Sequence, residues 1–344
     1  MADGQIAAEG RTVSPSGDVV LAVRDLMVTF PTAGGPLRAV RGAGYTLRRG
    51  ECLGIVGESG SGKSVSAAAV LGLLSKDARV EGSVQVGGRE VLTMEQKELQ
   101  AMRGSVVSMI FQEPSRSFDP IYSIGKTFEE TFRAKDRTVT PEESRKRAVQ
   151  LLSEVHIPRA EERLKNFPHQ FSGGMLQRIM IALALSNNPE ILIADEPTTA
   201  LDVTIQAQIA ALLRELQRSR QLSLIFISHD LGLVGQVADR ILVMYGGIVL
   251  EVGPTRDVLT TPHSPYTRAL LRALPAWGSH YTREELYTIR GNVPDPTRPE
   301  PGCPFAPRCA LVREECRQAI PPLRASRAED GERTYRCVVE GAKA

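Results

Sequence analysis

Runs of apolar residues that end in polar side chains recur along the first three quarters of the chain. PEILIADEP (189–197) and LSLIFISHD (222–230) are continuously apolar before they end in acids or histidine, which is typical of buried parallel strands. ECLGIVGESGSGKS (51–64) runs from an apolar strand through a glycine-rich loop into a helix. Strands separated by helices predict an α/β fold with a parallel sheet covered by helices.

Two other patterns complete the predicted elements of the first 261 residues. VVLAVRDLMVTF (19–30) is rich in β-branched residues and predicts a strand, and DRILVMYGGIVLEVG (239–253) predicts a hairpin that turns at Gly246 and Gly247. The charged segment 129–166 predicts helices, one of which begins with Thr140 as N-cap, Pro141 and Glu143. Its apolar stripe contains Ala148, Leu151, Leu152 and Val155.

Length and charge set limits on the class of protein. The 344 residues suggest two or three structural units, and 42 Lys+Arg against 40 Asp+Glu give no electrostatic argument for nucleic acid or acidic lipid as the main partner. The longest uncharged apolar stretch, 64–75, is shorter than the roughly 20 residues that span a bilayer. Residues 1–18 lack the pattern of a secretory signal, so we expect a loose tail there and a protein that stays inside the cell.

The glycine-rich loop carries the most specific motif. Gly57, Gly62, Lys63 and Ser64 match GxxxxGK[ST] between a strand and a helix, whereas a chance glycine-rich turn is the alternative. Backbone N–H groups of such a loop surround phosphate oxygens, the lysine neutralises the β and γ phosphates, and the serine hydroxyl ligates Mg²⁺. The predicted ATP-binding residues are Gly57, Glu58, Ser59, Gly60, Ser61, Gly62, Lys63, Ser64 and Val65.

Polar side chains that end apolar runs should meet at the same edge of the parallel sheet. Asp195 and Glu196 can divide two roles, a Mg²⁺ ligand and an activator of water, because neighbouring side chains of an extended chain point in opposite directions. His229 is placed to contact phosphate, and Gln112 can reach Mg²⁺ or water. Solvated strand ends and a structural histidine are the alternatives.

QFSGGMLQR (170–178) delivers a glycine pair onto the start of another helix. A helix N-terminus offers free N–H donors and a partial positive charge, so this segment is a second candidate anion site. The chain contains no second phosphate loop to accompany it.

Five motifs, in this order, resemble the defining segments of ABC transporter ATPases. They are GESGSGKS, SMIFQEP, FSGGMLQR, ILIADEPTTALD and FISHD. NFPHQFSGGM, TTALDVTIQAQI and HSPYTRALLRALP further resemble the D-type ATPase subunit of dipeptide and oligopeptide importers. The resemblance implies a P-loop NTPase of the ABC type, with a RecA-like parallel-sheet core, an antiparallel β subdomain and a helical subdomain at about 113–180. The expected units are the tail 1–18, the ATPase domain 19–261 and a C-terminal extension 262–344.

The resemblance also implies roles for single residues. Glu196 would be the general base, His229 the γ-phosphate contact, and Asp202 an acid that crosses the dimer. Ser64, Gln112 and Asp195 would bind Mg²⁺, and Gln112 would link it to the membrane subunits. Ser172, Gly173 and Gly174 would bind the ATP held by a partner subunit. Phe30 would stack on adenine, with a core position as the alternative.

In this family two ATPase chains close on ATP and drive two transmembrane permease subunits. The resemblance therefore implies ATP hydrolysis at the cytoplasmic face of the membrane, a second ATPase subunit as partner, and import of di- or oligopeptides delivered by a binding protein. A nickel or sugar importer is the alternative. A soluble ABC ATPase acting on nucleic acid or ribosomes is disfavoured by the near-neutral charge.

Four of the five cysteines are crowded into the last segment, with the spacing C-x5-C-x6-C-x20-C. Cys303, Cys309, Cys316 and Cys337 do not follow zinc-finger spacing. Related importer ATPases carry similar sets that can bind a [4Fe–4S] cluster, so the resemblance implies this cofactor, with zinc or free thiols as alternatives. Cys52, in the strand before the phosphate loop, is expected to be a small buried residue.

Overall fold

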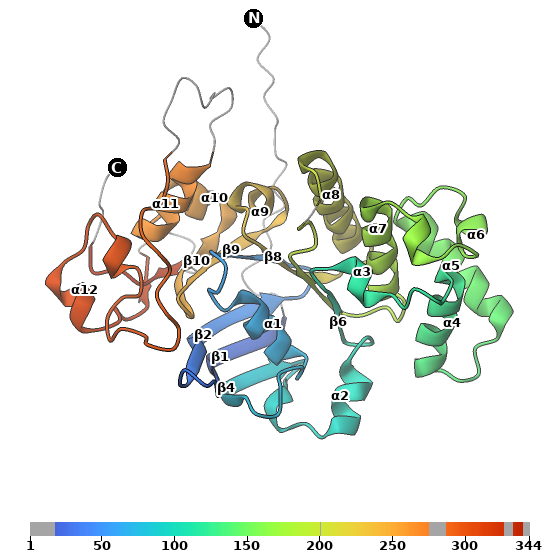
Figure 1. Ribbon diagram of the computed structural model, residues 1–344, viewed down its shortest axis with the longest axis horizontal. Coiled ribbons are helices and arrows are strands. Elements are labelled where there is room, and N and C mark those ends of the chain that lie inside the picture. The colour runs from blue at the N-terminus through green and yellow to red at the C-terminus, as the bar shows by residue number, and fades with distance from the viewer. Residues whose placement is uncertain (1–17, 200, 275–286, 327–332, 340–344) are drawn as a thin grey trace, which may run out of the picture.

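The computed structural model describes residues 18–199, 201–274, 287–326 and 333–339. The predicted tail, except Asp18, lies outside the described residues. Figure 1 shows the helical segment α4–α7 at one end of the molecule and the last part of the chain, with α12, at the opposite end. The strands β6, β8, β9 and β10 run between these two ends.

The main sheet confirms the predicted parallel core. Its strand order is β11-β12-β10-β9-β3-β8-β7-β6. The parallel strands are β9 (Arg240–Tyr245), β3 (Cys52–Val56), β8 (Ser223–Ser228), β7 (Ile191–Asp195) and β6 (Val107–Ile110). The antiparallel strands are β10 (Ile248–Pro254), β12 (Thr334–Tyr335) and β11 (Arg324–Ala325). The predicted hairpin is confirmed as β9–β10, and strands from the C-terminal segment extend the sheet beyond it.

A second, antiparallel sheet has the order β2-β1-β4-β5. Its strands are β1 (Val19–Phe30), β2 (Leu37–Arg48), β4 (Arg79–Val86) and β5 (Arg89–Glu90). This sheet confirms the strand predicted at 19–30 and supplies the antiparallel part of the expected ABC ATPase fold.

The helices follow the sequence signals for caps. The α-helices are α1 (Lys63–Val70), α2 (Gln96–Met102), α3 (Pro114–Ser117), α4 (Ile124–Lys135), α5 (Pro141–Glu154), α6 (Ala160–Arg163), α7 (Gly173–Ala184), α8 (Val203–Ser219), α9 (Leu231–Val237), α10 (Thr255–Thr260), α11 (Pro265–Ala273) and α12 (Glu314–Gln318). Helix α5 has the predicted capping box of Thr140 and Glu143. Short 3₁₀ turns occupy Val91–Thr93, Pro168–Gln170 and Ala306–Arg308.

The parallel strands separate two hydrophobic cores. Along β7, Leu192 belongs to the core under α7, α8 and α9, whereas Ile193 belongs to the core shared with α1 and the antiparallel sheet. Leu224 and Ile225 of β8 divide in the same way and are in register with these two residues. The side chains alternate between the faces with period two, so both faces of the sheet are covered and the strands read as continuously apolar.

Among the described residues, no helix combines the length and the apolar character needed for a membrane span.

Candidate active site at the phosphate loop

The loop between β3 and α1 is shaped by two glycines that no other residue can replace without distortion. At Gly57 a Cβ atom would lie 2.2 Å from the carbonyl oxygen of Met244, and at Gly62 it would lie 2.5 Å from the carbonyl oxygen of Ala39. Gly62 also has φ of 96° and directly precedes α1. The loop is therefore packed closely against the strands behind it, and residues 57–65 line a cavity on its other side.

Lys63 is folded back onto the loop that precedes it. Its Nζ donates to the carbonyl oxygens of Gly57 (2.8 Å) and Glu58 (3.1 Å), and lies 3.9 Å from Oε1 of Glu196. Burial lowers the pKa of the Lys63 ammonium, while the carboxylates of Glu196, Asp195 and Glu58 oppose this effect. The side chain thus holds a cation beside the loop, within the carboxylate cluster that ends β7.

Ser64 and Asp195 meet directly. The Ser64 hydroxyl donates to Oδ1 of Asp195 over 2.8 Å. Burial raises the pKa of the Asp195 carboxyl, and the hydrogen bond from Ser64 works against this shift. A hydroxyl and a carboxylate in contact at the end of a parallel strand form a donor set that suits Mg²⁺.

Glu196 lies at the centre of a group of polar side chains. Its Oε2 accepts from the Thr199 hydroxyl (2.9 Å) and from Nε2 of Gln112 (3.3 Å), and lies 3.4 Å from Nδ1 of His229. The structure thus brings together the predicted residues Gln112, Glu196 and His229, which follow three adjacent strands. Thr199 was missed, although it lies only three positions after Glu196 in the TTALD segment.

One premise about Glu196 was wrong. Strand β7 ends at Asp195, and Glu196 has φ of +46°, which is the left-handed region and not an extended conformation. The two carboxylates are therefore directed differently by a strained turn, not by strand alternation.

A cavity surrounds the phosphate loop. It is lined by residues 57–65 together with Gln112, Glu196, His229 and Leu270. Leu270 comes from α11, in the C-terminal part of the chain, and was not predicted to lie here. Asp202, Ser172, Gly173 and Gly174 are not among the described residues that line this cavity.

The second candidate anion site is the start of α7. Ser172 is its N-cap, and the Ser172 hydroxyl accepts from the backbone N–H of Met175. Gly174 faces α8 closely, because a Cβ at this position would lie 2.9 Å from Cγ2 of Ile205. Asp202 is the N-cap of α8 and accepts from the backbone N–H of Ile205. The start of α7 and the start of α8 thus form a separate unit, apart from the residues around the phosphate loop.

Phe30 is the last residue of β1, where the aromatic candidate for adenine stacking was predicted. Its side chain is half-buried and packs against the core shared with α1. The stacking role stays a prediction.

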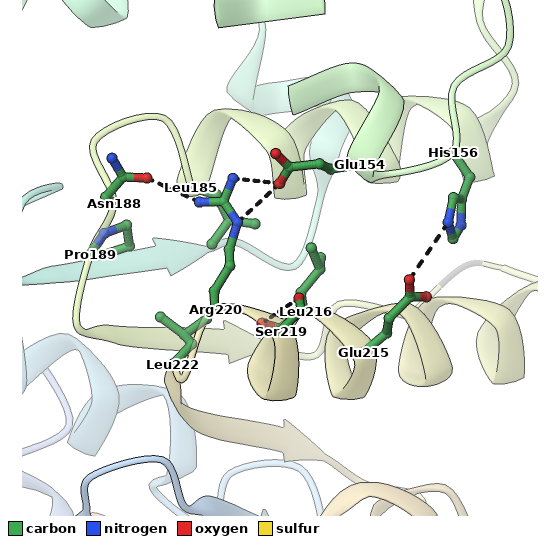
Figure 2. A pocket seen from close by; sticks show the side chains of 10 residues that line it. All are labelled: Glu154, His156, Leu185, Asn188, Pro189, Glu215, Leu216, Ser219, Arg220 and Leu222. Atoms are coloured by element: carbon green, nitrogen blue, oxygen red, sulfur yellow. Dashed lines mark hydrogen bonds and ion pairs between the residues drawn. The ribbon is translucent and has the colours of Figure 1, made fainter. Parts of the chain in front are cut away.

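A second large hollow lies between α5 and the end of α8 (Figure 2). Arg220 clasps Oε2 of Glu154 with Nη2 (2.5 Å) and Nε (3.0 Å), and also donates to Asn188. His156 faces Glu215 at 3.8 Å. The contacts of Arg220 with Glu154 and Asn188, drawn in Figure 2, tie the end of α5 to the end of α8 across the hollow.

The four C-terminal cysteines line one small cavity together with Phe305 and Arg336. Burial raises the pKa of Cys303 to about 11, and burial also raises the pKa of Cys309 and Cys337, with a further contribution from neighbouring thiols. In the described part of the chain, however, no group of three or more Cys, His, Asp or Glu side chains is placed to hold a metal ion. Cys52 is fully buried in β3, as expected.

Sequence similarity to two transport proteins places the chain in a family. Over 92% of its length it is 47% identical to the oligopeptide transport ATP-binding protein OppD of Salmonella typhimurium, of which 94% is covered. It is 46% identical to the dipeptide transport ATP-binding protein DppD of Bacillus subtilis, with 88% of this chain and 90% of that protein covered. The chain belongs to the ABC transporter ATP-binding proteins. The ABC transporter family matches residues 40–199, and the family "oligopeptide/dipeptide transporter, C-terminal region" matches residues 250–316.

Solved ABC ATPase structures share the fold. The dimeric structure of the ATP-binding cassette MJ0796 in a post-hydrolysis state with ADP and Pi has a TM-score of 0.61 at 27% identity, covering 69% of this chain and 99% of that chain. The cbiO1 structure from Clostridium perfringens has a TM-score of 0.60 at 27% identity and covers 71% and 92%. The ABC ATPase is thus an ATP-hydrolysing protein of the P-loop α/β class, in agreement with the fold and activity predicted from the sequence.

Proposed function

We propose that this ABC ATPase powers the import of di- or oligopeptides across the cytoplasmic membrane, as one of two ATPase subunits bound to two permease subunits. The proposal draws on the transport named for its relatives, oligopeptide for OppD and dipeptide for DppD, and on the matching C-terminal region. Import of nickel or a sugar by a related transporter is the alternative.

The main support for a two-subunit arrangement is that the two candidate anion sites, the phosphate loop and the start of α7, are separate. The start of α7, with Ser172, Gly173 and Gly174, does not line the cavity around the phosphate loop, although its N–H groups are suited to phosphate. A second ATPase chain that docks head to tail would bring its own α7 to this cavity. The MJ0796 cassette, a structural neighbour, is itself described as a dimer with ADP and Pi.

The residues in the cavity suggest how hydrolysis proceeds. Lys63 and the N–H groups of the loop would hold the phosphates, and Ser64, Asp195 and Gln112 would hold Mg²⁺, which would neutralise phosphate charge. Glu196 accepts the proton of the attacking water. His229, 3.4 Å from Glu196, contacts the γ-phosphate beside the base. Asp202 would cross the dimer interface from the partner.

Light scattering coupled to size exclusion tests the arrangement. Glu196→Gln, which we expect to bind ATP without hydrolysing it, is measured with and without ATP, alone and together with a co-expressed second ATPase chain. We expect an ATP-dependent rise to the mass of two ATPase chains. A chain that remains monomeric with ATP under both conditions would contradict the shared site.

Reconstitution with permeases and a binding protein tests the substrate class. ATP-dependent uptake of labelled di- and oligopeptides into proteoliposomes is compared with uptake of Ni²⁺ and of sugars. Peptide-stimulated ATP hydrolysis would support the proposal, whereas stimulation by Ni²⁺ or a sugar alone would replace it with the alternative.

The proposal extends to the four-cysteine cavity. We propose that Cys303, Cys309, Cys316 and Cys337 hold a [4Fe–4S] cluster, with Zn²⁺ as the alternative, because four thiols that share one cavity are a suitable donor set. Such a group would cross-link the extension, and binding it requires the sulfurs to converge. Iron, sulfide and zinc analysis of protein purified without oxygen tests this. Metal-free protein, or metal retained unchanged by Cys337→Ser, would contradict it.

A further inference from the structure

Two residues more than 200 positions later in the chain form hydrogen bonds with Glu58 of the phosphate loop. The backbone N–H of Glu58 donates to the hydroxyl of Tyr266 over 3.0 Å, and Oε2 of Glu58 pairs with Nη1 of Arg308 over 2.7 Å. The carbonyl oxygen of Glu58 accepts from Lys63. Glu58 is therefore hydrogen-bonded through its N–H, its carbonyl and its side chain. Two of the three partners, Tyr266 and Arg308, belong to the C-terminal part of the chain.

Arg308 is itself held rigidly. Its Nη1 also donates to the Tyr245 hydroxyl (3.0 Å), Nη2 donates to the carbonyl oxygen of Ile289 (3.0 Å), and Nε donates to that of Arg290 (3.0 Å). The side chain is only 6% exposed. All three guanidinium nitrogens have partners, so the group is a preorganised fork that a flexible cation cannot reproduce.

Aromatic rings support the same contact. Tyr245 at the end of β9, Tyr266 of α11 and Phe305 from the cysteine-rich segment have ring centroids 4.6 to 5.4 Å apart. Phe305 directly precedes the 3₁₀ turn Ala306–Arg308, and its ring packs against the two tyrosines whose hydroxyls bond to Arg308 and to Glu58. The extension thus reaches the loop through a packed cluster and not through a surface ion pair.

The charge of Arg308 matters for an anionic ligand. Glu58 is a carboxylate within a loop that binds phosphates, and its Oε1 is buried without a hydrogen-bond partner among the described residues. Without Arg308 this carboxylate would carry an uncompensated negative charge beside the triphosphate. The Glu58 side chain would also lose the hydrogen bond from Arg308 that positions it, while its backbone N–H would keep Tyr266 as partner.

We propose that Arg308 and Tyr266 are positioning residues for the phosphate loop, so that the C-terminal extension sets the affinity of this ABC ATPase for ATP. They act through Glu58 and do not touch the reacting atoms. The inference concerns nucleotide binding by this chain alone, so it stands whether the transported solute is a peptide or something else.

A double-mutant cycle tests the coupling. The dissociation constant for a fluorescent ATP analogue is measured with Mg²⁺ for the unaltered chain, Arg308→Ala, Glu58→Gln and the double variant. We expect Arg308→Ala to weaken binding at least about tenfold, which is about 1.4 kcal/mol. In the Glu58→Gln background the same change should weaken binding less than about threefold, because the carboxylate that Arg308 neutralises is gone.

Two further variants separate positioning from general damage. Arg308→Lys keeps the charge without the fork and should recover part of the affinity. Arg333→Ala is the matched control: its side chain is also buried in the extension, at 4% exposed, but it pairs with Glu251 and donates to the Thr261 hydroxyl. Arg333→Ala should lower the unfolding temperature and still leave ATP affinity within about twofold of the unaltered chain.

Two results would overturn the proposal. One is an Arg308→Ala chain that binds the analogue as tightly as the unaltered chain. The other is an equal loss on adding Arg308→Ala with and without Glu58→Gln, which would mean that Arg308 acts independently of the loop. If Arg308→Ala does not fold, Tyr266→Phe removes only the hydroxyl that accepts from Glu58, and unchanged affinity in that variant would overturn the role of Tyr266.

Discussion

Replacing Arg333 by Met should destabilise the protein by several kcal/mol, because it strands a charge in the interior. Oε1 of Glu251 pairs with Nη2 of Arg333 at 2.7 Å, and the two side chains are 0% and 4% exposed. Glu251 also accepts from the backbone N–H groups of His263 (2.9 Å) and Ser264 (3.0 Å). Breaking a buried pair by removing one partner costs about 3–5 kcal/mol, a large part of the 5–15 kcal/mol of total stability typical of a domain.

The assay is urea unfolding followed by circular dichroism at 25 °C. Arg333→Met should lower the free energy of unfolding by about 3–5 kcal/mol. Adding Glu251→Gln should restore part of it, since an amide removes the unpaired charge but still accepts one backbone hydrogen bond. The control is Arg145→Met in the pair with Glu161, whose side chains are 56% and 67% exposed, where the loss should be about 0–1 kcal/mol.

A loss below about 1 kcal/mol in Arg333→Met would refute the reasoning, because it would equate the interior pair with a surface pair. A double variant no more stable than Arg333→Met would refute the claim that the stranded carboxylate causes the loss.

Three further predictions concern the site and the extension. Glu196→Gln should still bind ATP and lose about 10²- to 10⁴-fold in turnover, measured by phosphate release; near-normal hydrolysis would remove Glu196 from the role of base. Lys63→Ala should weaken ATP binding in a fluorescence titration, and unchanged affinity would contradict the assignment of the loop. Burial, assisted by Arg333, lowers the pKa of His263 below its usual 6.5, so the unfolded chain takes up the proton first as the pH falls. Stability should therefore decrease as the pH falls below about 6.5, and His263→Phe should flatten this dependence in urea unfolding at pH 7.5 and 5.5.

The sequence predicted those parts of the site whose place in the fold follows from their order along the chain. A strand, a loop and a helix in succession placed Gly57 to Ser64, and side chains at the ends of adjacent parallel strands had to meet at one edge, which brought Gln112, Glu196 and His229 together. These predictions require only the apolar runs that mark the strands and the fact that parallel strands end at the same edge of a sheet.

The parts that were missed depend on contacts between distant segments or on backbone geometry without a residue signature. Tyr266 and Arg308 are 208 and 250 positions from Glu58, and neither stands in a motif that names its partner. The left-handed conformation of Glu196 was missed because glutamate carries no signal for it, unlike glycine. The grouping of the four cysteines, in contrast, was expected from their crowding in the last segment, and all four line one cavity.

The short strands β12 and β11 have a consequence for the solubility of the chain. β12 pairs with β10, so the backbone N–H and C=O groups on the outer side of β10 already have partners at Glu251 and Val252. A chain that ended before these strands would present that row of groups, flanked by apolar side chains, to any other extended polypeptide. With these strands in place, this edge of the main sheet in the described part of the chain is the two-residue strand β11, which offers little backbone for another polypeptide to pair with.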